Sequence, residues 1–383
     1  MEKLNIAVLF GGCSPEYEIS LQSAYGVISH IDDAKYKPIL LGITPSGEWR
    51  LFSGEPEKIK SGTWNNAADC VNAIISPDRK TRGILTFGKD AVHAIRLDAA
   101  FPVLHGKNGE DGTVQGLLAL AGIPVVGCGT LASALCMDKG KAHKIAGAIG
   151  VGVPRSFTLR KGMGEAGTVS HFYAQALQLG YPLFVKPVKA GSSYGITKVL
   201  EEGALLAAVK LAFEYDDEII IEENIPGFEI GCAVFGNDNL VVGVVDEIEL
   251  AGGFLDYKEK YFRETAVIHV PGRIPEEKAE EAKGTAKAIY RALGCSGFAR
   301  VDMFLTPSGK IVFNEVNTIP GLTVCSRYPN MLKAAGMTFE QAVNGWIDAV
   351  VRCFVTGVNC QAETAREEML AVKRRYDKTE GIV

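Results

Sequence analysis

The stretch RVDMFLTPSGKIVFNEVNTIPG, residues 300–321, decides the fold of this chain. Two apolar runs within it predict a pair of neighbouring strands, at 300–305 and 310–315. The first strand carries Asp302, the second ends at Glu315, and Asn317 follows two residues later. One Asp, one Glu and one Asn together suit Mg²⁺, which prefers few carboxylates and completes its shell with phosphate oxygens. The stretch therefore predicts a hairpin that binds a magnesium ion.

These carboxylates also have a plainer interpretation, as solvated groups on an ordinary hairpin, and for either acid alone that interpretation is favoured. Their shared setting favours the metal instead. Both acids lie within apolar strands, where an unpaired charge is costly and a bound cation removes the cost. The next four residues, Thr318 to Gly321, predict a turn whose backbone amides can face developing negative charge.

A second segment with chemistry lies upstream, where Lys186 ends a predicted strand and precedes the loop AGSSYG at 190–195. Small residues allow backbone amides to approach phosphates closely. A tight hairpin has the same composition, but the lysine on the adjacent strand favours a phosphate-binding loop. The Walker spacing is absent, and Gly11-Gly12 does not make a dinucleotide fingerprint. P-loop and nicotinamide chemistry are therefore excluded.

The N-terminal part opens as strand 4–10, a Gly-Gly turn and helix 20–31, which predicts a doubly wound α/β domain. Further strands are predicted at 38–43, 99–104 and 123–126, with helices after Gly112 and Leu131. From about residue 137 the pattern changes to sheet-rich α+β. Its predicted helices are 139–150, 170–179 and 276–293, and its further strands are 181–188, 197–200, 218–223, 230–235 and 240–245.

These patterns divide the chain into domains at 1–135, 136–225 and 226–350, followed by a helical or disordered tail at 351–383. The polar and aromatic segment 252–265 is too long for a simple turn, which is typical of a lid over a site.

Composition limits the classes of function. A chain of 383 residues with 47% hydrophobic residues is long enough for two or three domains with real cores. Its net charge of −5, without a basic run, argues against nucleic acid as a partner. No apolar run approaches the ~20 residues that a membrane helix requires, and no signal peptide is apparent. The nine scattered cysteines form no Cys-x-x-Cys pair, so we expect a cytoplasmic protein with reduced thiols.

Taken together, these motifs resemble the ATP-grasp superfamily, and within it the D-alanine:D-alanine ligases, including the vancomycin-resistance D-alanine:D-serine ligases of the VanG type. The resemblance covers residues 4–350. Besides the two segments above, it rests on FGG at 10–12, SPEYEIS at 14–20, HGKNGEDG at 105–112 and MDK at 137–139. It implies an N-terminal pre-ATP-grasp domain that holds the first D-alanine, followed by an ATP-grasp fold of two subdomains.

The resemblance assigns residues to ATP and to the metal. It implies that Lys139, Lys186 and Ser193 hold phosphates, that Glu222, Glu223 and Ile225 line the adenine, and that Glu229 holds the ribose. Asp302, Glu315 and Asn317 match the ligands of two Mg²⁺ or Mn²⁺ ions. ATP is then a co-substrate. Relatives of this kind are commonly homodimers, which we also expect here.

The resemblance further implies that Glu16 fixes the ammonium group of the first D-alanine, and that Ser192 and Tyr261 close the lid with it. The first D-alanine would form an acyl phosphate held by Mg²⁺, Lys260 and Arg300, and the amide of Gly321 would help to stabilise the oxyanion when the second amine attacks. Three residues also have a second interpretation. Glu16 suits the start of a helix, Tyr261 suits a half-buried loop, and His105 suits either a structural role or the substrate pocket.

The acceptor is the least certain substrate. Glu259-Lys260-Tyr261 resembles ligases that use an amine, which argues against D-lactate. Beside Ser326, Arg327 stands where D-alanine:D-alanine ligases usually carry an apolar residue, and a polar side chain suits the hydroxyl of D-serine. The alternative is an exposed arginine that snorkels from a helix start. Cys325 and Leu255 depart from the family pattern and leave the acceptor less certain.

Three hypotheses result. The first is a D-alanine:D-serine ligase for peptidoglycan precursors and vancomycin resistance, and the second is a housekeeping D-alanine:D-alanine ligase. The third, a nucleotide-binding protein without chemistry, is disfavoured because Arg300, Asp302, Glu315 and Asn317 are all present.

Overall fold

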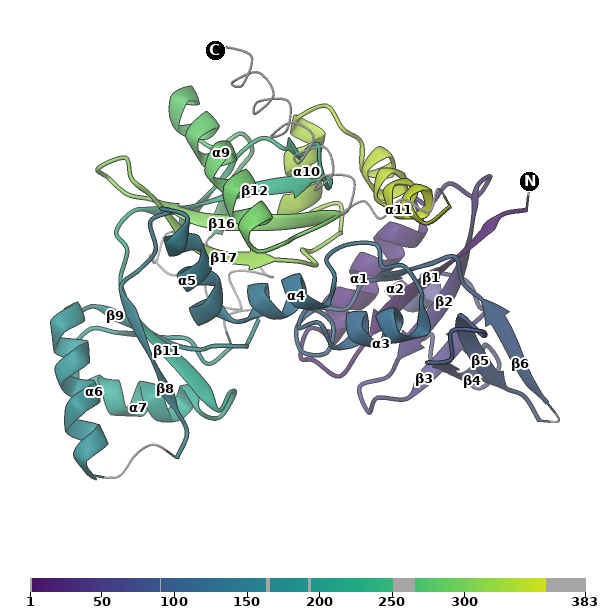
Figure 1. The fold of residues 1–383 in the computed structure, drawn as a ribbon, viewed down its shortest axis with the longest axis horizontal. Helices are drawn as coiled ribbons and strands as arrows, with labels where there is room; N and C mark the ends of the chain where they lie inside the picture. Colours follow the sequence, from purple (N-terminus) through teal and green to yellow (C-terminus); the bar gives the residue numbers. More distant parts are fainter. Residues whose placement is uncertain (1, 90, 163–165, 192–193, 251–265, 356–383) are drawn as a thin grey trace, which may run out of the picture.

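A computed structural model describes residues 2–89, 91–162, 166–191, 194–250 and 266–355. It contains three β-sheets, each flanked by helices (Figure 1). The first sheet forms the right-hand part of the view, the second the lobe at the lower left, and the third the upper centre. The predicted lid at 252–265 and the tail at 363–378 lie outside the described residues.

The first sheet contains seven strands in the order β6-β5-β4-β3-β2-β1-β7. Their bounds are β1 (Leu4–Gly11), β2 (Tyr36–Ile43), β3 (Trp49–Phe52), β4 (Cys70–Ile75), β5 (Gly83–Phe87), β6 (Val92–Arg96) and β7 (Ala99–Pro102). β1 pairs in parallel with β2 and β7, as the doubly wound prediction requires. The helices of this part are α1 (Tyr17–Ile28), α2 (Glu57–Lys60), α3 (Thr113–Ala121) and α4 (Thr130–Met137).

Two sequence predictions for this sheet need correction. The antiparallel extension β3 to β6 was not predicted, because its short strands expose many side chains and lack a continuous apolar run. The strand expected at 123–126 forms only one isolated parallel bridge, between Ala100 and Val125.

The turn after β1 is fixed by local packing. Gly11 has φ +87°, and a side chain there would collide with the carbonyl of Ile43. The Ser20 hydroxyl on α1 accepts a hydrogen bond from the Gly11 amide at 2.8 Å and donates to the Val103 carbonyl. These bonds hold the start of α1 at the carboxyl ends of β1 and β7, the edge where ligands bind in open α/β sheets.

The second sheet is smaller and antiparallel, in the order β10-β9-β11-β8. Its strands are β8 (Ser156–Arg160), β9 (Leu183–Pro187), β10 (Thr197–Val199) and β11 (Glu218–Glu223), and α6 (Ala166–Leu179) and α7 (Glu202–Ala212) accompany it. Helix α5 (Lys139–Ala148) precedes β8 and packs instead on the third sheet, through Ala142 and Ala146. Leu183, Val185, Ile219 and Ile221 form the apolar core of the second sheet. Because side chains alternate along a strand, Lys186 and Glu222 lie on the opposite face.

The third sheet contains the 300–321 hairpin as β16 (Phe298–Leu305) and β17 (Ile311–Asn317), and the predicted pairing is confirmed, with Asp302 opposite Glu315. The order is β15-β14-β12-β16-β17, and β13 pairs with β12. The other bounds are β12 (Phe228–Phe235), β13 (Val241–Val242), β14 (Asp246–Leu250) and β15 (Ala266–His269). The strand expected at 240–245 is wrong in its bounds, because only Val241–Val242 pairs there and β14 begins at Asp246.

Helix α9 (Glu276–Ala292) packs through Ala282, Ala286 and Ile289 on one face of this sheet, against Ile230, Val301 and Met303. Two further helices, α10 (Arg327–Ala334) and α11 (Phe339–Val355), join the third sheet to the first. Their residues Tyr328, Met331 and Trp346 share one buried cluster with Phe10 and Phe101. The first and third sheets are therefore held together by a continuous apolar core.

The proposed domain boundaries remain a proposal. Residue 135 lies within α4, residue 225 lies between β11 and β12, and residue 350 lies within α11. Throughout the described ranges, every helix is too short or too polar to span a membrane.

Candidate active site

A cavity of about 350 Å³ lies between the second and third sheets. From the second sheet it is lined by Phe184 and Lys186 on β9 and by Glu222 and Glu223 on β11. From the third sheet it is lined by residues of β12, β14, β16 and β17. The structure thus brings together six of the residues predicted to bind ATP: Lys139, Lys186, Glu222, Glu223, Ile225 and Glu229.

Two buried lysines lie at this cavity. Lys186 forms an ion pair with Glu222. Lys139 donates to the Ala190 carbonyl at 2.9 Å, and its Nζ lies 3.6 Å from Glu315 Oε2. The Asp138 side chain caps α5 by accepting from the Lys141 amide at 2.9 Å, which fixes the helix that begins with Lys139. Both lysines thus lie at one cavity, each beside a glutamate.

His143 is a buried residue beside this site that the sequence did not single out. One turn after Lys139 on α5, it forms a 2.8 Å hydrogen bond through Nε2 with the Asn314 carbonyl on β17. Its other nitrogen, Nδ1, is buried and has no partner among the described residues. Burial lowers the His143 pKa, although Glu222 acts in the opposite direction. The i, i+4 spacing from Lys139 was the available signal.

Asp302 is the centre of the predicted metal site, and it is almost completely buried. Arg300 donates to both of its oxygens, at 2.8 Å and 2.7 Å, and the Asn317 amide donates to it at 2.8 Å. Burial lowers the Arg300 pKa, but the Asp302 carboxylate outweighs that effect and the pKa is raised.

The donor set here fits a magnesium ion that is bound together with a nucleotide. Asp302, Glu315 and Asn317 supply oxygens from neighbouring positions of β16 and β17. Within the described residues, no cluster of three or more His, Cys, Asp or Glu side chains could hold a metal by itself. Two carboxylates and one amide would need phosphate oxygens to complete a shell, which is the pattern that Mg²⁺ favours.

Glu16 lies where the first sheet meets the 190–195 loop. A Cβ built on Gly191 would lie 2.9 Å from Glu16 Oε2, and one on Gly106 would lie 2.5 Å from the same atom. The carboxylate is buried and makes no side-chain cap to α1, although Glu16 is at the N-cap position. Glu16 thus stands at the start of α1, as the helix-terminal alternative expects, and its carboxylate also lies beside Gly191 and Gly106.

The turn at 318–321 is held by the first sheet. His105 Nδ1 lies 2.9 Å from the Ile319 carbonyl, and its Nε2 lies 3.1 Å from the Ser23 hydroxyl. Glu110 accepts from the Ile319 amide at 3.0 Å and from the Gly106 amide at 2.8 Å. Both nitrogens of His105 thus have contacts within the protein, which fits the structural alternative.

Arg327 is buried, which rules out the alternative of an exposed, snorkelling side chain. It donates to both oxygens of Asp246, at 2.7 Å and 2.8 Å, and to Glu229 Oε1 at 2.7 Å. Burial lowers the Arg327 pKa, but Asp246 and Asp302 outweigh that effect and raise it well above the usual value. Asp246 was missed in the sequence, because the strand was expected to end at 245.

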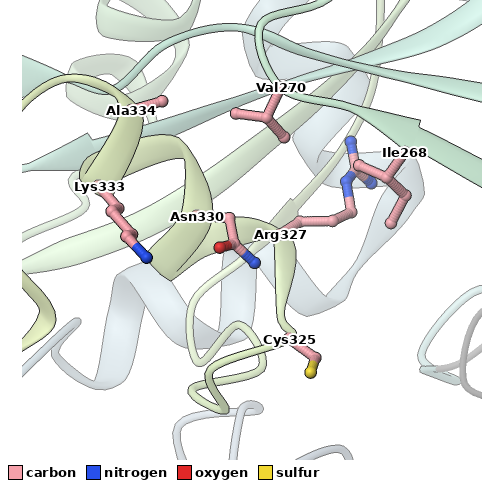
Figure 2. Close-up of a pocket in the computed structure, with 7 residues that line it drawn as sticks. All are labelled: Ile268, Val270, Cys325, Arg327, Asn330, Lys333 and Ala334. Atoms are coloured by element: carbon pink, nitrogen blue, oxygen red, sulfur yellow. The ribbon is translucent and has the colours of Figure 1, made fainter.

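A second cavity, of about 500 Å³, lies on the other side of Arg327 (Figure 2). Figure 2 shows Arg327 running toward Ile268 of β15, with Asn330 and Lys333 further along α10 and Cys325 before the helix. Ser326 at the N-cap of α10 makes no cap, and its hydroxyl contacts the Thr323 hydroxyl at 2.8 Å.

Several predicted site residues lie outside the described part of the chain, namely Ser192, Ser193, Leu255, Glu259, Lys260 and Tyr261. Seven cysteines are free thiols, namely Cys13, Cys70, Cys128, Cys136, Cys232, Cys295 and Cys325.

Comparisons with known proteins agree with this geometry. A family model described as the D-ala D-ala ligase N-terminus matches residues 5–128, and one described as the D-ala D-ala ligase C-terminus matches residues 145–348. The crystal structure of the VanG D-Ala:D-Ser ligase from Enterococcus faecalis is 52% identical, with a TM-score of 0.84, over 91% of this chain and 100% of that one.

Two curated relatives are nearly as similar. The vancomycin B-type resistance protein VanB of Enterococcus faecalis is 44% identical over 92% of this chain and 99% of its own length. A D-alanine–D-alanine ligase of Caldicellulosiruptor bescii is 41% identical over 92% of this chain and 96% of its own length.

Proposed function

The chain belongs to the D-alanine–D-alanine ligase family, and we propose that it joins D-alanine to a second D-amino acid, D-serine, using ATP and Mg²⁺. The observation that carries the proposal is that groups from all three parts of the chain meet around Lys139. Lys139 and Glu315 line the 350 Å³ cavity together with Lys186, and they also line a smaller cavity with Glu110, Gly191 and Asn317. Glu16, at the N-cap of α1, lies beside Gly191. The alternative is a housekeeping ligase that uses a second D-alanine, as the Caldicellulosiruptor relative is named.

In the first step, the carboxylate of D-alanine attacks the γ-phosphorus of ATP. The bond to the bridging oxygen breaks, ADP leaves and an acyl phosphate forms. Glu16 would hold the ammonium group of D-alanine, while Lys139 and Lys186 would bind the phosphates and offset their charge. Mg²⁺ would be held by Asp302, Glu315 and Asn317, and it would supply further charge neutralisation at the phosphates.

In the second step, the deprotonated amine of the acceptor attacks the acyl carbon. A carbon–nitrogen bond forms and phosphate leaves with the electrons of the carbon–oxygen bond. Arg300 and the Gly321 amide would stabilise the oxyanion in between. Water must be excluded so that it does not attack first. The cavity beside Lys139, Gly191 and Asn317 holds only about 30 Å³ of free space, which favours that exclusion.

The choice of D-serine is supported by the donors of Arg327. A guanidinium has five N–H groups, and three of them donate to Asp246 and Glu229. Of the described residues, only Asp302, at 3.4 Å from Nη2, makes a further ion pair with it. A donor therefore remains for a hydroxyl. A site that bonds a hydroxyl discriminates strongly against the analogue without it.

The test supplies Mg²⁺, ATP, D-alanine and D-serine at equal amino-acid concentrations and measures phosphate release and products by mass spectrometry. D-alanyl-D-serine should predominate, and D-lactate in place of D-serine should give no ester. Exclusive formation of D-alanyl-D-alanine would overturn the D-serine assignment alone. Failure to release phosphate with any D-amino acid would overturn the ligase itself.

The cellular role follows from the product. The dipeptide would enter peptidoglycan precursors made in the cytoplasm, and a D-serine terminus would confer vancomycin resistance. Expression in a susceptible bacterium should raise the inhibitory concentration of vancomycin, and precursors that still end only in D-alanine would contradict this role.

We also propose that the protein forms a homodimer.

A further inference from the structure

Arg327 forms part of the wall between two cavities. It lines the 500 Å³ cavity beside β15 and α10, and its Nη1 lies 2.7 Å from Glu229, which lines the 350 Å³ nucleotide cavity. The side chain of Arg327 is 9% exposed and that of Glu229 is 13% exposed. Arg327 therefore lines the 500 Å³ cavity itself and reaches the 350 Å³ cavity through a single carboxylate.

The position of this guanidinium is fixed by the register of the third sheet. Gly231 on β12 is paired with Asp246 on β14 and with Asp302 on β16. A Cβ on Gly231 would collide with the Arg327 guanidinium and with the Asp246 carboxylate. The arginine therefore lies flat over a glycine, between two fixed carboxylates, where a planar fork can bond two partners at once.

Glu229 lies two residues before Gly231 on β12, so the two residues are on the same face of the sheet. Its Oε1 accepts the bond from Arg327. Over the ranges that the structure describes, no hydrogen bond is made to its other oxygen, Oε2, although Glu229 lines the nucleotide cavity. One oxygen is thus held by the arginine, and the other is available to a ligand.

We propose that Arg327 is the positioning residue for Glu229, so that the arginine at the 500 Å³ cavity sets how the nucleotide cavity recognises the ribose hydroxyls of ATP. This inference rests on the proposed function in one respect, namely that ATP is the ligand of the nucleotide cavity. It does not depend on which amino acid is the acceptor. Without the arginine, Glu229 has no fixed rotamer and bonds the ribose poorly.

The experiment measures the dissociation constants of ATP, 2′-deoxy-ATP and 3′-deoxy-ATP with Mg²⁺ and the full chain, with no amino acid present. The wild type should bind ATP about 10- to 100-fold more tightly than at least one analogue, the range for a hydrogen bond to a charged group. Arg327→Lys should reduce that preference to about threefold or less, because an ammonium cannot bond Asp246 and Glu229 in the same way. Glu229→Gln should reduce it similarly.

Two further variants separate positioning from general damage. Asp246→Asn removes the other partner of Arg327 but leaves the Arg327–Glu229 pair, so it should keep the preference of the wild type. Arg327→Leu combined with Asp246→Leu removes the charge pair as a unit, which is tolerated better than one unpaired charge, and it should lose the preference while remaining folded by circular dichroism. Arg50→Leu, on β3 of the first sheet, is the remote arginine control.

The outcomes are distinct. A wild type that binds no ATP would overturn the proposed function. A wild type that binds ATP and both deoxy analogues equally would overturn the present inference alone. So would a preference for ATP that survives in both variants at Arg327.

Discussion

Two buried ion pairs on opposite walls of the nucleotide cavity differ in how completely the protein satisfies them. On the second sheet, Lys186 pairs with Glu222 and lies over the Phe184 ring, and Glu222 Oε2 is buried without a hydrogen-bond partner among the described residues. On the third sheet, Arg327 bonds Asp246 and Glu229 and lies 3.4 Å from Asp302.

The difference shows two uses of a buried cation. A lysine ammonium is compact and can redirect its donors, so Lys186 can turn toward a phosphate when one arrives. An arginine whose fork is already bonded to carboxylates is fixed, and it positions those carboxylates. Lys186 can therefore rearrange when a ligand binds, whereas Arg327 holds Asp246 and Glu229 in place and offers a ligand only the N–H groups that these carboxylates leave.

The largest expected effect is the loss of kcat/KM for ATP when Lys186 is replaced. Lys186→Met should lower kcat/KM for ATP by about 100- to 1000-fold, because charge stabilisation at the transferring phosphate is lost. Phosphate release at varied ATP measures it, and circular dichroism checks the fold. Glu222→Gln, which keeps the lysine, should be much milder. Less than a tenfold loss in Lys186→Met would contradict the assignment of Lys186 to a phosphate.

The next largest effect is on the stability of the protein, through the ion pairs of Arg327. Arg327→Leu leaves buried carboxylates unpaired and should destabilise the protein by about 3–5 kcal/mol. Arg327→Leu with Asp246→Leu should recover much of that loss. The midpoint of thermal unfolding measures both. If the double variant melts below the single variant, the charges do not act as a unit.

A smaller effect should follow from the residue beneath the lysines. His143→Phe keeps the ring packed on Phe313 but loses the bond to the Asn314 carbonyl, a loss of about 1 kcal/mol. Since that bond joins α5 to β17, the KM for ATP should rise several-fold with little change in kcat. His143→Gln, which places an amide donor at a similar reach, should restore it. Equal kinetics in both variants would remove the positioning role.

The smallest effect is a pH dependence of stability. Burial lowers the pKa of His143 below its usual 6.5. At acidic pH the imidazole of His143 therefore binds a proton more readily in the unfolded chain than in the folded one. This contribution to stability is fully present above pH 6.5 and is lost as the pH falls below it. His143→Phe should flatten the fall in unfolding midpoint over that range, and an unchanged slope would argue that other groups cause it.

Much of the site could be predicted from the sequence. The pairing of the two strands of the 300–321 hairpin could be predicted, because two apolar runs joined by a short turn favour an antiparallel pair. The register at Asp302 could not be predicted, because a bulge between Asp302 and Met303 shifts the pairing by one residue and brings Asp302 opposite Glu315. The predicted ATP-binding residues that the structure describes do line one cavity. The antiparallel strands β3 to β6 were missed, because half-exposed edge strands carry little apolar pattern.

The sequence by itself determined which chemical groups are present and on which face of each strand they lie, since side-chain alternation is local. Only the tertiary structure decided that Arg327 is buried and that Asp246 and Glu229 are its partners. In the sequence, Arg327 is 81 positions from Asp246 and 98 positions from Glu229. They meet through the docking of α10 on the sheet and the register of β12 with β14, which long-range packing sets and no local pattern contains.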